Sequence, residues 1–569
     1  MFFTIRFSTI TDNASPTLQG RQEQLLQDIK PRISRSENDV DASPFDDPLS
    51  PQSRALEWLL NDVISLSEDG VTTKVLERYA LAVFYYSTDG PDWKDNLSFL
   101  SETDACFWNN GLIATQGSFL RGAYCERSEA VDFVHIFKNG LVGTIPWELS
   151  LLTNLRSCNL EENFLHGTLP TEVGQLIFLE ELFAGNNSLS GAFPSEIGFL
   201  SSLVALALAN NSFMGTLPTE LGRLTSLEYF LVNENDLTGT IPTELGQMSG
   251  LKSIDIDFNV LNGTIPTELG RLTLLDFLDV NSNSFSGTVP TELGQLTALT
   301  ILDINTNALT GSLPKELGTL TNLTVLSFAI NLFTGTLPTE LGKVTGLENF
   351  FAYTNKLSGT LPTQFRYLRA ITTFNVRDNM ITGTLPPEIV ECAALKVFSI
   401  EDNNLSGTIP TVIGQLLLLQ HFAVNNNIFN GTLPTELGQL SALSFLEVSY
   451  NNFTGTLPTE FTQLTALDYL GVVQNLLTGT LPTELGQLTV LTMLGLYANS
   501  FTGTLPTELG SMSRVDSLFV AQNQFTGTLP SELGRLTKMT QMYLSDNVLT
   551  GTIPTDRVGT IDSNDYPPS

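Results

Sequence analysis

The stretch from Gly287 to Thr310, GTVPTELGQLTALTILDINTNALT, decides the fold of most of the chain because its pattern returns every 24 residues. A glycine opening GTxP or a close variant recurs 18 times between Gly143 and Gly551, and an asparagine stands four residues before each of these glycines. A fixed internal period of this length is typical of a solenoid, in which each repeat packs only on its neighbours. We therefore predict about 18 stacked coils of 24 residues.

One coil contains a short strand with two different sides. Leu302 and Ile304 alternate with Asp303 at the period of a strand, so we expect the two apolar side chains to face the core and Asp303 to face outward. The recurring asparagine, Asn307 in this coil, is expected to point inward and satisfy backbone groups where the coil bends.

The segment after the asparagine predicts a turn and then a short helical turn. Gly287 suits the tight turn, and Pro290 fixes φ at a position that needs no backbone donor. We expect Thr291 to cap the helical turn, Glu292 to favour its positive end, and Gly294 to let it stop.

The pattern LxxLxLxxNxLxGxLP, as in NALTGSLPKELGTLTNLTVLSF at residues 307–328, resembles the plant-type leucine-rich repeat. The resemblance covers residues 131–562. It implies an α/β solenoid, a right-handed superhelix with a parallel sheet on its concave face, a second short strand at each LxGxLP, and helical turns on the convex side.

The preceding segment also resembles a known element, the N-terminal cap of plant and algal leucine-rich repeat receptor-like proteins. The matching stretches are LERYALAVFYYSTDGPDWKDN at 76–96, ACFWNNG at 105–111 and AYCERSEAVDFVHI at 123–136. The resemblance implies a disulfide between Cys106 and Cys125, and such a bond implies an oxidising compartment.

Four segments follow from these patterns. Residues 1–48 are rich in Ser, Asp, Asn and Pro and are predicted to be disordered. Residues 49–130 form a cap whose first helix starts at Ser50 or Ser53, residues 131–562 form the solenoid, and residues 563–569 form a tail. The tail lacks the cysteine pair that often closes such arrays, so we expect it, another subunit or further sequence to cover the last coil.

The formal net charge of -33 argues against nucleic acid as a partner, because phosphates would be repelled. Cationic ligands are accommodated more easily. No apolar run approaches the roughly 20 residues that a membrane span needs, and the first residues give no clear signal peptide. No oligomeric state is predicted.

The residues that carry most enzyme chemistry are sparse. His135, His166 and His421 lie far apart in the array, and no nucleophile with a base is suggested. Cys158 and Cys392 fall on apolar columns and are expected to be buried free thiols. We therefore predict no enzymatic activity, no cofactor and no metal site.

The outward side chains of the strands differ from coil to coil and are the candidate ligand surface. Acidic, amide and aromatic groups gather near the middle, at Tyr229, Asp255, Asp257, Asp279, Asn281, Asp303, Asn305, Phe351 and Tyr353. In neighbouring strands Asp255, Asp279 and Asp303 would form a ladder of like charges that a bound cation, a basic peptide or sugar hydroxyls would relieve. The alternative is a solvated acidic face that salt screens.

A second candidate surface consists of Thr and Ser columns that flank the glycine of LxGxLP, such as Thr334 and Thr336. These two columns resemble the flat faces of ice-binding β-solenoids, although threonine is also a favoured strand residue.

The sequence therefore predicts a non-enzymatic binding protein or receptor-like ectodomain, extracellular or at the cell surface, that recognises a peptide, glycan or protein on its concave sheet. The alternatives are a structural, adhesive or ice-binding surface protein, and an inhibitor of an extracellular hydrolase. Eight Asn-x-Ser/Thr sequons between Asn96 and Asn452 make it a candidate glycoprotein.

Overall fold

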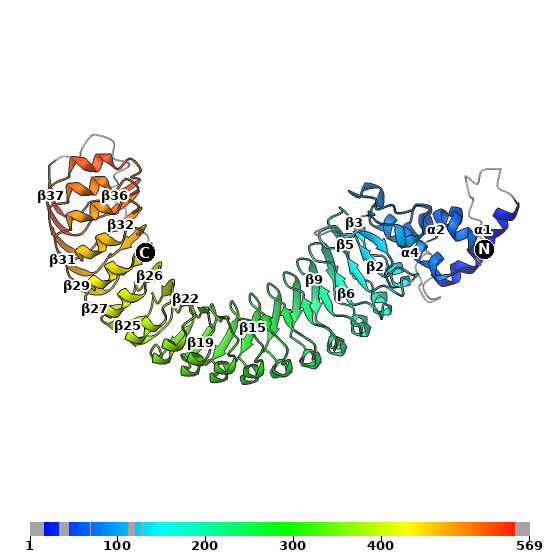
Figure 1. The fold of residues 1–569 in the computed structure, drawn as a ribbon, viewed down its shortest axis with the longest axis horizontal. Coiled ribbons are helices and arrows are strands. Elements are labelled where there is room, and N and C mark those ends of the chain that lie inside the picture. Colours follow the sequence, from blue (N-terminus) through cyan, green and yellow to red (C-terminus); the bar gives the residue numbers. More distant parts are fainter. Residues whose placement is uncertain (1–15, 34–44, 69, 112–119, 128, 552–569) are drawn as a thin grey trace. The chain divides into compact units, whose positions relative to one another are not determined.

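The structure is a computed structural model that describes residues 16–33, 45–68, 70–111, 120–127 and 129–551. The chain divides into two compact units, residues 1–272 and residues 273–569, and each is considered by itself. The first unit holds the N-terminal helices, in blue in Figure 1, and the first coils. The second unit consists of further coils of the same kind.

Four α-helices lie in the first unit: α1 (Pro16–Ile33), α2 (Pro51–Asn61), α3 (Val63–Ser67) and α4 (Thr73–Ser87). Helix α1 corrects the prediction that residues 1–48 are disordered. Its side chains Leu25, Ile29 and Ile33 recur at every fourth residue, are buried, and belong to the same core as α2 and α4. The polar composition around α1 hid this apolar stripe; residues 1–15 and 34–44 of the predicted segment lie outside the described residues.

Helix α2 begins as predicted for the first of the two candidate serines. Ser50 is its N-cap, and the Ser50 hydroxyl accepts a hydrogen bond from the Ser53 backbone N–H at 3.1 Å. The cap core also contains a buried ion pair, in which the Arg78 guanidinium donates to both carboxylate oxygens of Asp62 at 2.7 and 2.8 Å. Arg78 lies over the Trp58 and Trp108 rings, so its charge is paired and its flat face is packed.

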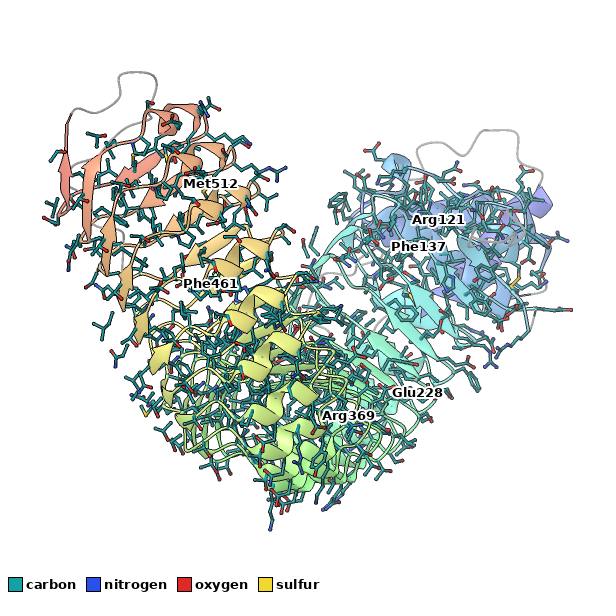
Figure 2. The ribbon with its side chains drawn as sticks, turned by 60° about the vertical axis from the view of Figure 1, so that its left-hand side comes forward. Arg121, Phe137, Glu228, Arg369, Phe461 and Met512 are labelled. Carbon is teal, nitrogen blue, oxygen red and sulfur yellow. A yellow bond between two sulfur atoms is a disulfide. The ribbon has the colours of Figure 1, made fainter. Side chains whose placement is uncertain are left out.

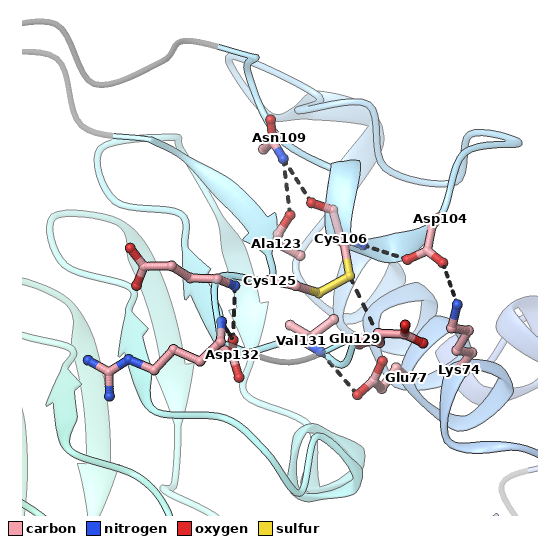
Figure 3. The surroundings of a disulfide bond; sticks show 12 residues. Lys74, Glu77, Asp104, Cys106, Asn109, Ala123, Cys125, Glu129, Val131 and Asp132 are labelled. Atoms are coloured by element: carbon pink, nitrogen blue, oxygen red, sulfur yellow. Dashed lines mark hydrogen bonds and ion pairs between the residues drawn. A yellow bond between two sulfur atoms is a disulfide. The ribbon is translucent and has the colours of Figure 1, made fainter.

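Cys106 and Cys125 form a disulfide, as the family resemblance implied (Figure 3). The bond joins the short helix η2 (Ala105–Phe107) to the segment that follows strand β1 (Gly122–Tyr124). Next to it, Asp104 accepts from the Cys106 backbone N–H and forms an ion pair with Lys74 at 3.3 Å. The disulfide therefore ties the helical part of the cap to the start of the sheet.

Each coil contributes one strand to a main sheet. In the first unit these strands are β1, β2 (Phe133–His135), β4 (Ser157–Asn159), β6 (Glu181–Phe183), β8 (Ala205–Ala207), β10 (Tyr229–Leu231) and β12 (Ser253–Asp255). Strand β1 pairs antiparallel with β2, and the later strands pair parallel, with partners 24 residues apart.

In the second unit the main-sheet strands continue the same spacing. They are β14 (Phe277–Asp279), β16 (Ile301–Asp303), β18 (Val325–Ser327), β20 (Asn349–Phe351), β22 (Thr373–Asn375), β24 (Val397–Ser399), β26 (His421–Ala423), β28 (Phe445–Glu447), β30 (Tyr469–Gly471), β32 (Met493–Gly495), β34 (Ser517–Phe519) and β36 (Gln541–Tyr543). Neighbouring strands of this unit pair parallel and in register, such as β14 and β16, where Asp279 lies opposite Asp303.

A second short strand follows in each coil, as predicted from LxGxLP. In the first unit these are β3 (Val142–Thr144), β5 (Phe164–Gly167), β7 (Ser188–Gly191), β9 (Ser212–Thr216), β11 (Asp236–Gly239) and β13 (Val260–Gly263). In the second unit they are β15 (Ser284–Gly287), β17 (Ala308–Gly311), β19 (Leu332–Thr336), β21 (Lys356–Ser358), β23 (Thr382–Thr384), β25 (Asn404–Gly407), β27 (Ile428–Thr432), β29 (Asn452–Gly455), β31 (Leu476–Gly479), β33 (Ser500–Gly503), β35 (Gln524–Thr528) and β37 (Val548–Thr550).

The core of each unit lies between its strands and its own 3₁₀ turns, which are η3 (Trp147–Leu151) to η8 (Thr267–Arg271) in the first unit and η9 (Thr291–Gln295) to η19 (Ser531–Arg535) in the second. The inward columns are almost wholly leucine, isoleucine, valine and phenylalanine, and they are buried. Phe461 and Met512, labelled in Figure 2, take positions on the turn side where most coils have leucine, and both are buried. Burial of these columns supplies the main driving force for stacking.

The recurring asparagine has the role that was predicted. In Asn331 the side-chain carbonyl accepts from the Leu309 backbone N–H at 2.9 Å, and the amide group donates to the carbonyls of Ile304, Phe328 and Ala329 at 3.0 to 3.3 Å. Two of these four partners belong to the preceding coil. One side chain thus satisfies backbone groups in two coils at once.

The helical turn differs from the prediction in two details. Pro290 is the N-cap of η9 (Thr291–Gln295), no side chain caps this turn, and the Thr291 hydroxyl instead donates to the Glu292 carboxylate at 3.1 Å. Gly294 lies inside the turn, where an added Cβ would come 2.7 Å from the backbone oxygen of Glu316 in the next coil. Gly294 is therefore needed for the close approach of two coils, and does not end the turn.

We predict that Asn331→Ala lowers the free energy of unfolding by about 3 kcal/mol, because it leaves several buried backbone groups without partners. Chemical denaturation of the full chain, followed by circular dichroism, measures this change. Asn452→Ala is the control, since Asn452 is exposed on β29, and it should change stability by less than about 0.5 kcal/mol. Equal effects of the two substitutions would contradict the role assigned to the buried amide.

A second prediction concerns the residue before each asparagine, which has a positive φ in every coil. Ile330 has φ of 50° and is 42% exposed, whereas Asn186, Asn210 and Asn426 hold the same position elsewhere. A β-branched residue is strained there, so Ile330→Asn should stabilise the chain by about 1 kcal/mol. Ile428→Asn, at a similarly exposed position in strand β27, should not stabilise it. A thermal unfolding midpoint that falls for Ile330→Asn would refute this account.

Candidate functional site

The candidate site is the outward face of the main sheet, meaning the side chains that point away from the leucine columns on its strands and on the residue two positions after each strand. In the first unit this face contains three of the predicted residues. Tyr229 on β10 is 42% exposed, Asp255 ends β12, and Asp257 follows two residues later. Leu231 lies opposite Asp255, so an apolar and an acidic side chain are neighbours on this surface.

In the second unit Asp279 and Asp303 lie directly opposite each other on β14 and β16, as predicted. Each carboxylate is already hydrogen-bonded within its own coil. Asp279 accepts from the backbone N–H and the side-chain amide of Asn281, at 3.0 and 2.7 Å, and Asp303 accepts from the same groups of Asn305, at 3.0 and 2.6 Å. These Asx turns give both aspartates a local role, and partial burial raises the pKa of Asp303.

The predicted aromatic residues Phe351 and Tyr353 lie further along the same unit. Phe351 ends β20, and Tyr353 follows two residues later. The guanidinium of Arg377 lies over the Tyr353 ring at 5.2 Å. Arg377 was not among the predicted residues, although its position one coil after Tyr353 could have been read from the 24-residue period.

Three aromatic side chains stack on the outward face beyond the predicted region. His421, Phe445 and Tyr469 hold the same position in successive coils, and their ring centroids are 4.3 Å apart in both steps. Burial of the His421 ring lowers its pKa, so it is neutral at neutral pH. The 24-residue period also places these three residues in one column, but the predicted ligand surface ended at Tyr353 and did not include them.

Glu447 on β28 is held firmly beside this stack. Its carboxylate accepts from the Tyr469 hydroxyl at 2.5 Å and from the Ser449 backbone N–H at 2.9 Å. Gly471 makes room for it, since an added Cβ at Gly471 would come 2.3 Å from a Glu447 oxygen. A larger residue at Gly471 would displace the carboxylate from Tyr469.

Glu401 is the most unusual charged residue on the outward face of the second unit. It follows β24 by two residues and is only 9% exposed. Its Oε1 atom lies 4.0 Å from the Arg377 guanidinium, and no described residue donates a hydrogen bond to its buried Oε2 atom. Burial raises the pKa of Glu401 to about 7, well above its ordinary value of 4.5.

A polar network near the cap links a histidine to a serine. The Ser157 hydroxyl donates to the Glu181 carboxylate at 2.7 Å, and the His135 Nε2 atom lies 2.8 Å from the same hydroxyl oxygen. His135 Nδ1 lies 3.0 Å from the Tyr124 hydroxyl, and burial lowers the pKa of His135 to about 4. Because the serine proton is committed to Glu181, the neutral His135 donates to Ser157 and is not placed to take a proton from it.

The two remaining cysteines are free and buried, as predicted. Burial raises the pKa of Cys158 and of Cys392 to about 12. The thiolate, which is the reactive form, is therefore disfavoured at both positions.

The threonine columns on the second strands have structural contacts. Hydroxyls before the glycine donate to the preceding coil's glycine carbonyl, as Thr310 does to Gly287 at 3.2 Å and Thr382 to Gly359 at 3.0 Å. The residue after the glycine lies against the next coil, since an added Cβ at Gly311 would come 2.8 Å from the Thr288 methyl group. These contacts hold coils together; an ice-binding role stays a prediction.

Comparison with known proteins places the chain in a family. A protein-family model described as a leucine-rich repeat region matches residues 367–554. The crystallised TDR receptor is 30% identical, with 74% of this chain and 82% of that chain covered and a TM-score of 0.65. The chain therefore belongs to the plant-type leucine-rich repeat proteins, as predicted. A search of curated protein sequences finds no match.

Two further solved structures that are similar to this chain are ectodomains of plant receptor kinases. The GASSHO1/SCHENGEN3 receptor kinase ectodomain from Arabidopsis thaliana, in complex with CASPARIAN STRIP INTEGRITY FACTOR 2, is 33% identical with a TM-score of 0.67; the match covers 74% of this chain but only 53% of that one. The Arabidopsis receptor kinase HAESA, in complex with the peptide hormone IDA and the co-receptor SERK1, is 28% identical over 76% of this chain and 81% of that chain, with a TM-score of 0.65.

The solenoid and the receptor-like ectodomain architecture agree with these comparisons. Within the described ranges, no helix has both the length and the apolar character that crossing a membrane requires.

We predict that Glu401→Gln stabilises the chain at high pH. The native state holds the Glu401 proton more tightly than the unfolded state, so this favourable contribution is complete below pH 4.5 and is lost as pH rises through 7. Glutamine keeps the neutral shape at every pH. Its stabilising effect relative to wild type should therefore grow by about 2 kcal/mol between pH 5 and pH 8.

Urea unfolding midpoints of the full chain at pH 5 and pH 8 measure this difference. Glu436→Gln on η15 (Thr435–Gln439) is the matched control and should show no such growth. A Glu401→Gln effect that is the same at both pH values would show that Glu401 does not titrate in this window.

Proposed function

We propose that the chain is the ligand-binding ectodomain of a receptor-like protein or a secreted binding protein that takes a peptide on the outward face of its main sheet. It acts by binding, without catalysing a reaction, outside the cell or at its surface. The sequons would carry glycans in that location. The region proposed for contact comprises Tyr229, Asp255 and Asp257 in the first unit, and Asp279, Asn281, Asp303, Asn305, Phe351 and Tyr353 in the second.

The observation that carries this proposal is the contrast between the two sides of each strand. Inward positions repeat nearly the same buried apolar residues from coil to coil, whereas outward positions change between acidic, amide, aromatic and small residues. Packing in the core does not require this variation. A surface that is free to vary on a constant scaffold is suited to recognition.

The chemistry of that surface favours a peptide. In the second unit, Phe351 and Tyr353 offer aromatic contact area, and the arginine at Tyr353 and the nearby carboxylates offer charged groups of both signs. Aromatic and arginine side chains are enriched where proteins bind peptides and proteins. The similar ectodomain of HAESA is described with a peptide hormone bound, which supports the same class of ligand here.

A displayed random-peptide library, selected on the secreted full chain, tests the proposal. Asp303→Asn and Tyr353→Ala should each weaken a selected peptide by about tenfold. The matched controls Asp276→Asn and Tyr367→Ala remove the same groups from exposed positions outside the outward face, and they should change affinity less than about twofold. The proposal would be overturned if the control substitutions abolished peptide binding while Asp303→Asn and Tyr353→Ala did not. A loss of binding only in Thr336→Arg, on the second strands, would overturn it as well.

A further inference from the structure

A second part of the outward face lies around Glu401, a buried carboxyl group with few interactions inside the chain. Glu401 is buried, its Oε2 atom has no hydrogen-bond donor among the described residues, and its Oε1 atom is at the 4.0 Å limit of an ion pair with Arg377. Buried carboxylate oxygens in folded proteins normally have partners. The Glu401 carboxyl group therefore has few interactions to lose when a ligand approaches.

The surroundings of Glu401 are acidic. Asp378 and Asp402 are exposed next to the same strands, and the ionised forms of Asp402 and Glu447 both raise the pKa of Glu401. Arg377 is the cation that opposes them, yet half of its side chain is exposed and its guanidinium lies over Tyr353. The balance leaves negative charge at Glu401 that is only weakly compensated.

Two small side chains lie on the strands next to Glu401. Ser399 and Ala423 lie opposite each other on β24 and β26, and both are small and buried although they point outward. The stack of His421, Phe445 and Tyr469 begins at the other end of the strand that holds Ala423. Asn425 holds the same position as Glu401 in the next coil and adds an amide oxygen.

We propose that Glu401 is a subsite for a protonated primary amine of the ligand, which donates to the Glu401 carboxylate while its hydrocarbon part lies toward the aromatic stack. This inference rests on the proposed function, because it assigns one contact of a ligand on the outward face. A compact ammonium with three donors suits one open oxygen better than the planar fork of a guanidinium does.

The Glu401 side chain must turn toward solvent to meet the amine. Its side-chain torsions allow this turn, and burial in the free chain disfavours its ionised form. Ammonium binding restores a charged pair at the surface. The same step releases Glu401 from Arg377, which keeps its contact with Tyr353.

The probe is a fluorescein-labelled tetralysine peptide, titrated into the full chain at about 150 mM salt to screen distant charges. Glu401→Gln should weaken its binding by about tenfold. Asp402→Asn and Asp378→Asn remove the same charge from exposed neighbours and should change affinity less than about twofold. Equal losses in all three variants would show diffuse attraction to an acidic surface and would overturn the subsite.

Two further arms sharpen the test. Arg377→Gln removes the competing cation and should tighten binding, whereas Arg369→Gln, at an exposed ion pair with Glu391, should not. One peptide is tetralysine with acetylated side chains and a free N-terminus, and the other is tetralysine with free side chains and an acetylated N-terminus. Their affinities show whether the chain binds a lysine amine or a terminal amine. If neither binds better than the fully acetylated peptide, no amine is recognised and the inference is wrong.

The outcomes separate this inference from the proposed function. If the binding of library peptides depends on Tyr353 but not on Glu401, the amine subsite is refuted and the proposed function is still supported. An unchanged unfolding midpoint for Glu401→Gln at pH 5 confirms that a loss of binding does not come from misfolding.

Discussion

The amide of the recurring asparagine is the interaction on which every coil depends. A coil must turn sharply after its main-sheet strand, and the turn leaves backbone N–H and C=O groups that neither sheet can pair. Asn331 shows the solution, because its one amide accepts from and donates to the preceding coil and also donates twice within its own coil. Aspartate has no donors and glutamine is longer, so neither could make the same four bonds.

Close stacking imposes a second constraint, and it explains the small residues of the repeat. Gly294 and its counterparts allow the backbone of the next coil to approach, and the glycine of LxGxLP adopts a positive φ while a threonine methyl lies against it. These positions therefore have little freedom to vary. Neither constraint acts on the outward side chains of the main sheet. Differences between coils are therefore concentrated at these positions.

The fold could be predicted from sequence because its causes are local and repeated. The 24-residue period is visible in the sequence, and the inward asparagine and the turn glycine each have one physical role that is the same in every coil. The Cys106–Cys125 bond followed from resemblance. Helix α1 was missed because its apolar stripe of Leu25, Ile29 and Ile33 is diluted by polar residues and gains stability from packing on α2. Thr291 was expected to cap the helical turn, but Pro290 holds the N-cap position and no side chain makes a capping hydrogen bond.

The candidate site was harder to predict, for a different reason. The sequence indicates which side chains face outward, but it does not show what they meet. Asp303 could be placed on the outward face, whereas its bond to Asn305 depends on the geometry after the strand. Glu401 has the same kind of position as Asn305, and only the packing around it shows that it is buried and lacks a partner.

The network beside the cap has a direction. From Tyr124 through His135 and Ser157 to Glu181, every hydrogen is donated the same way, toward the carboxylate. With this direction the Nε2 proton of His135 is donated to Ser157 and the Nδ1 lone pair accepts from Tyr124, so the ring is fixed in one neutral tautomer. His135 therefore links two hydroxyl groups and has no ring nitrogen left to coordinate a metal ion.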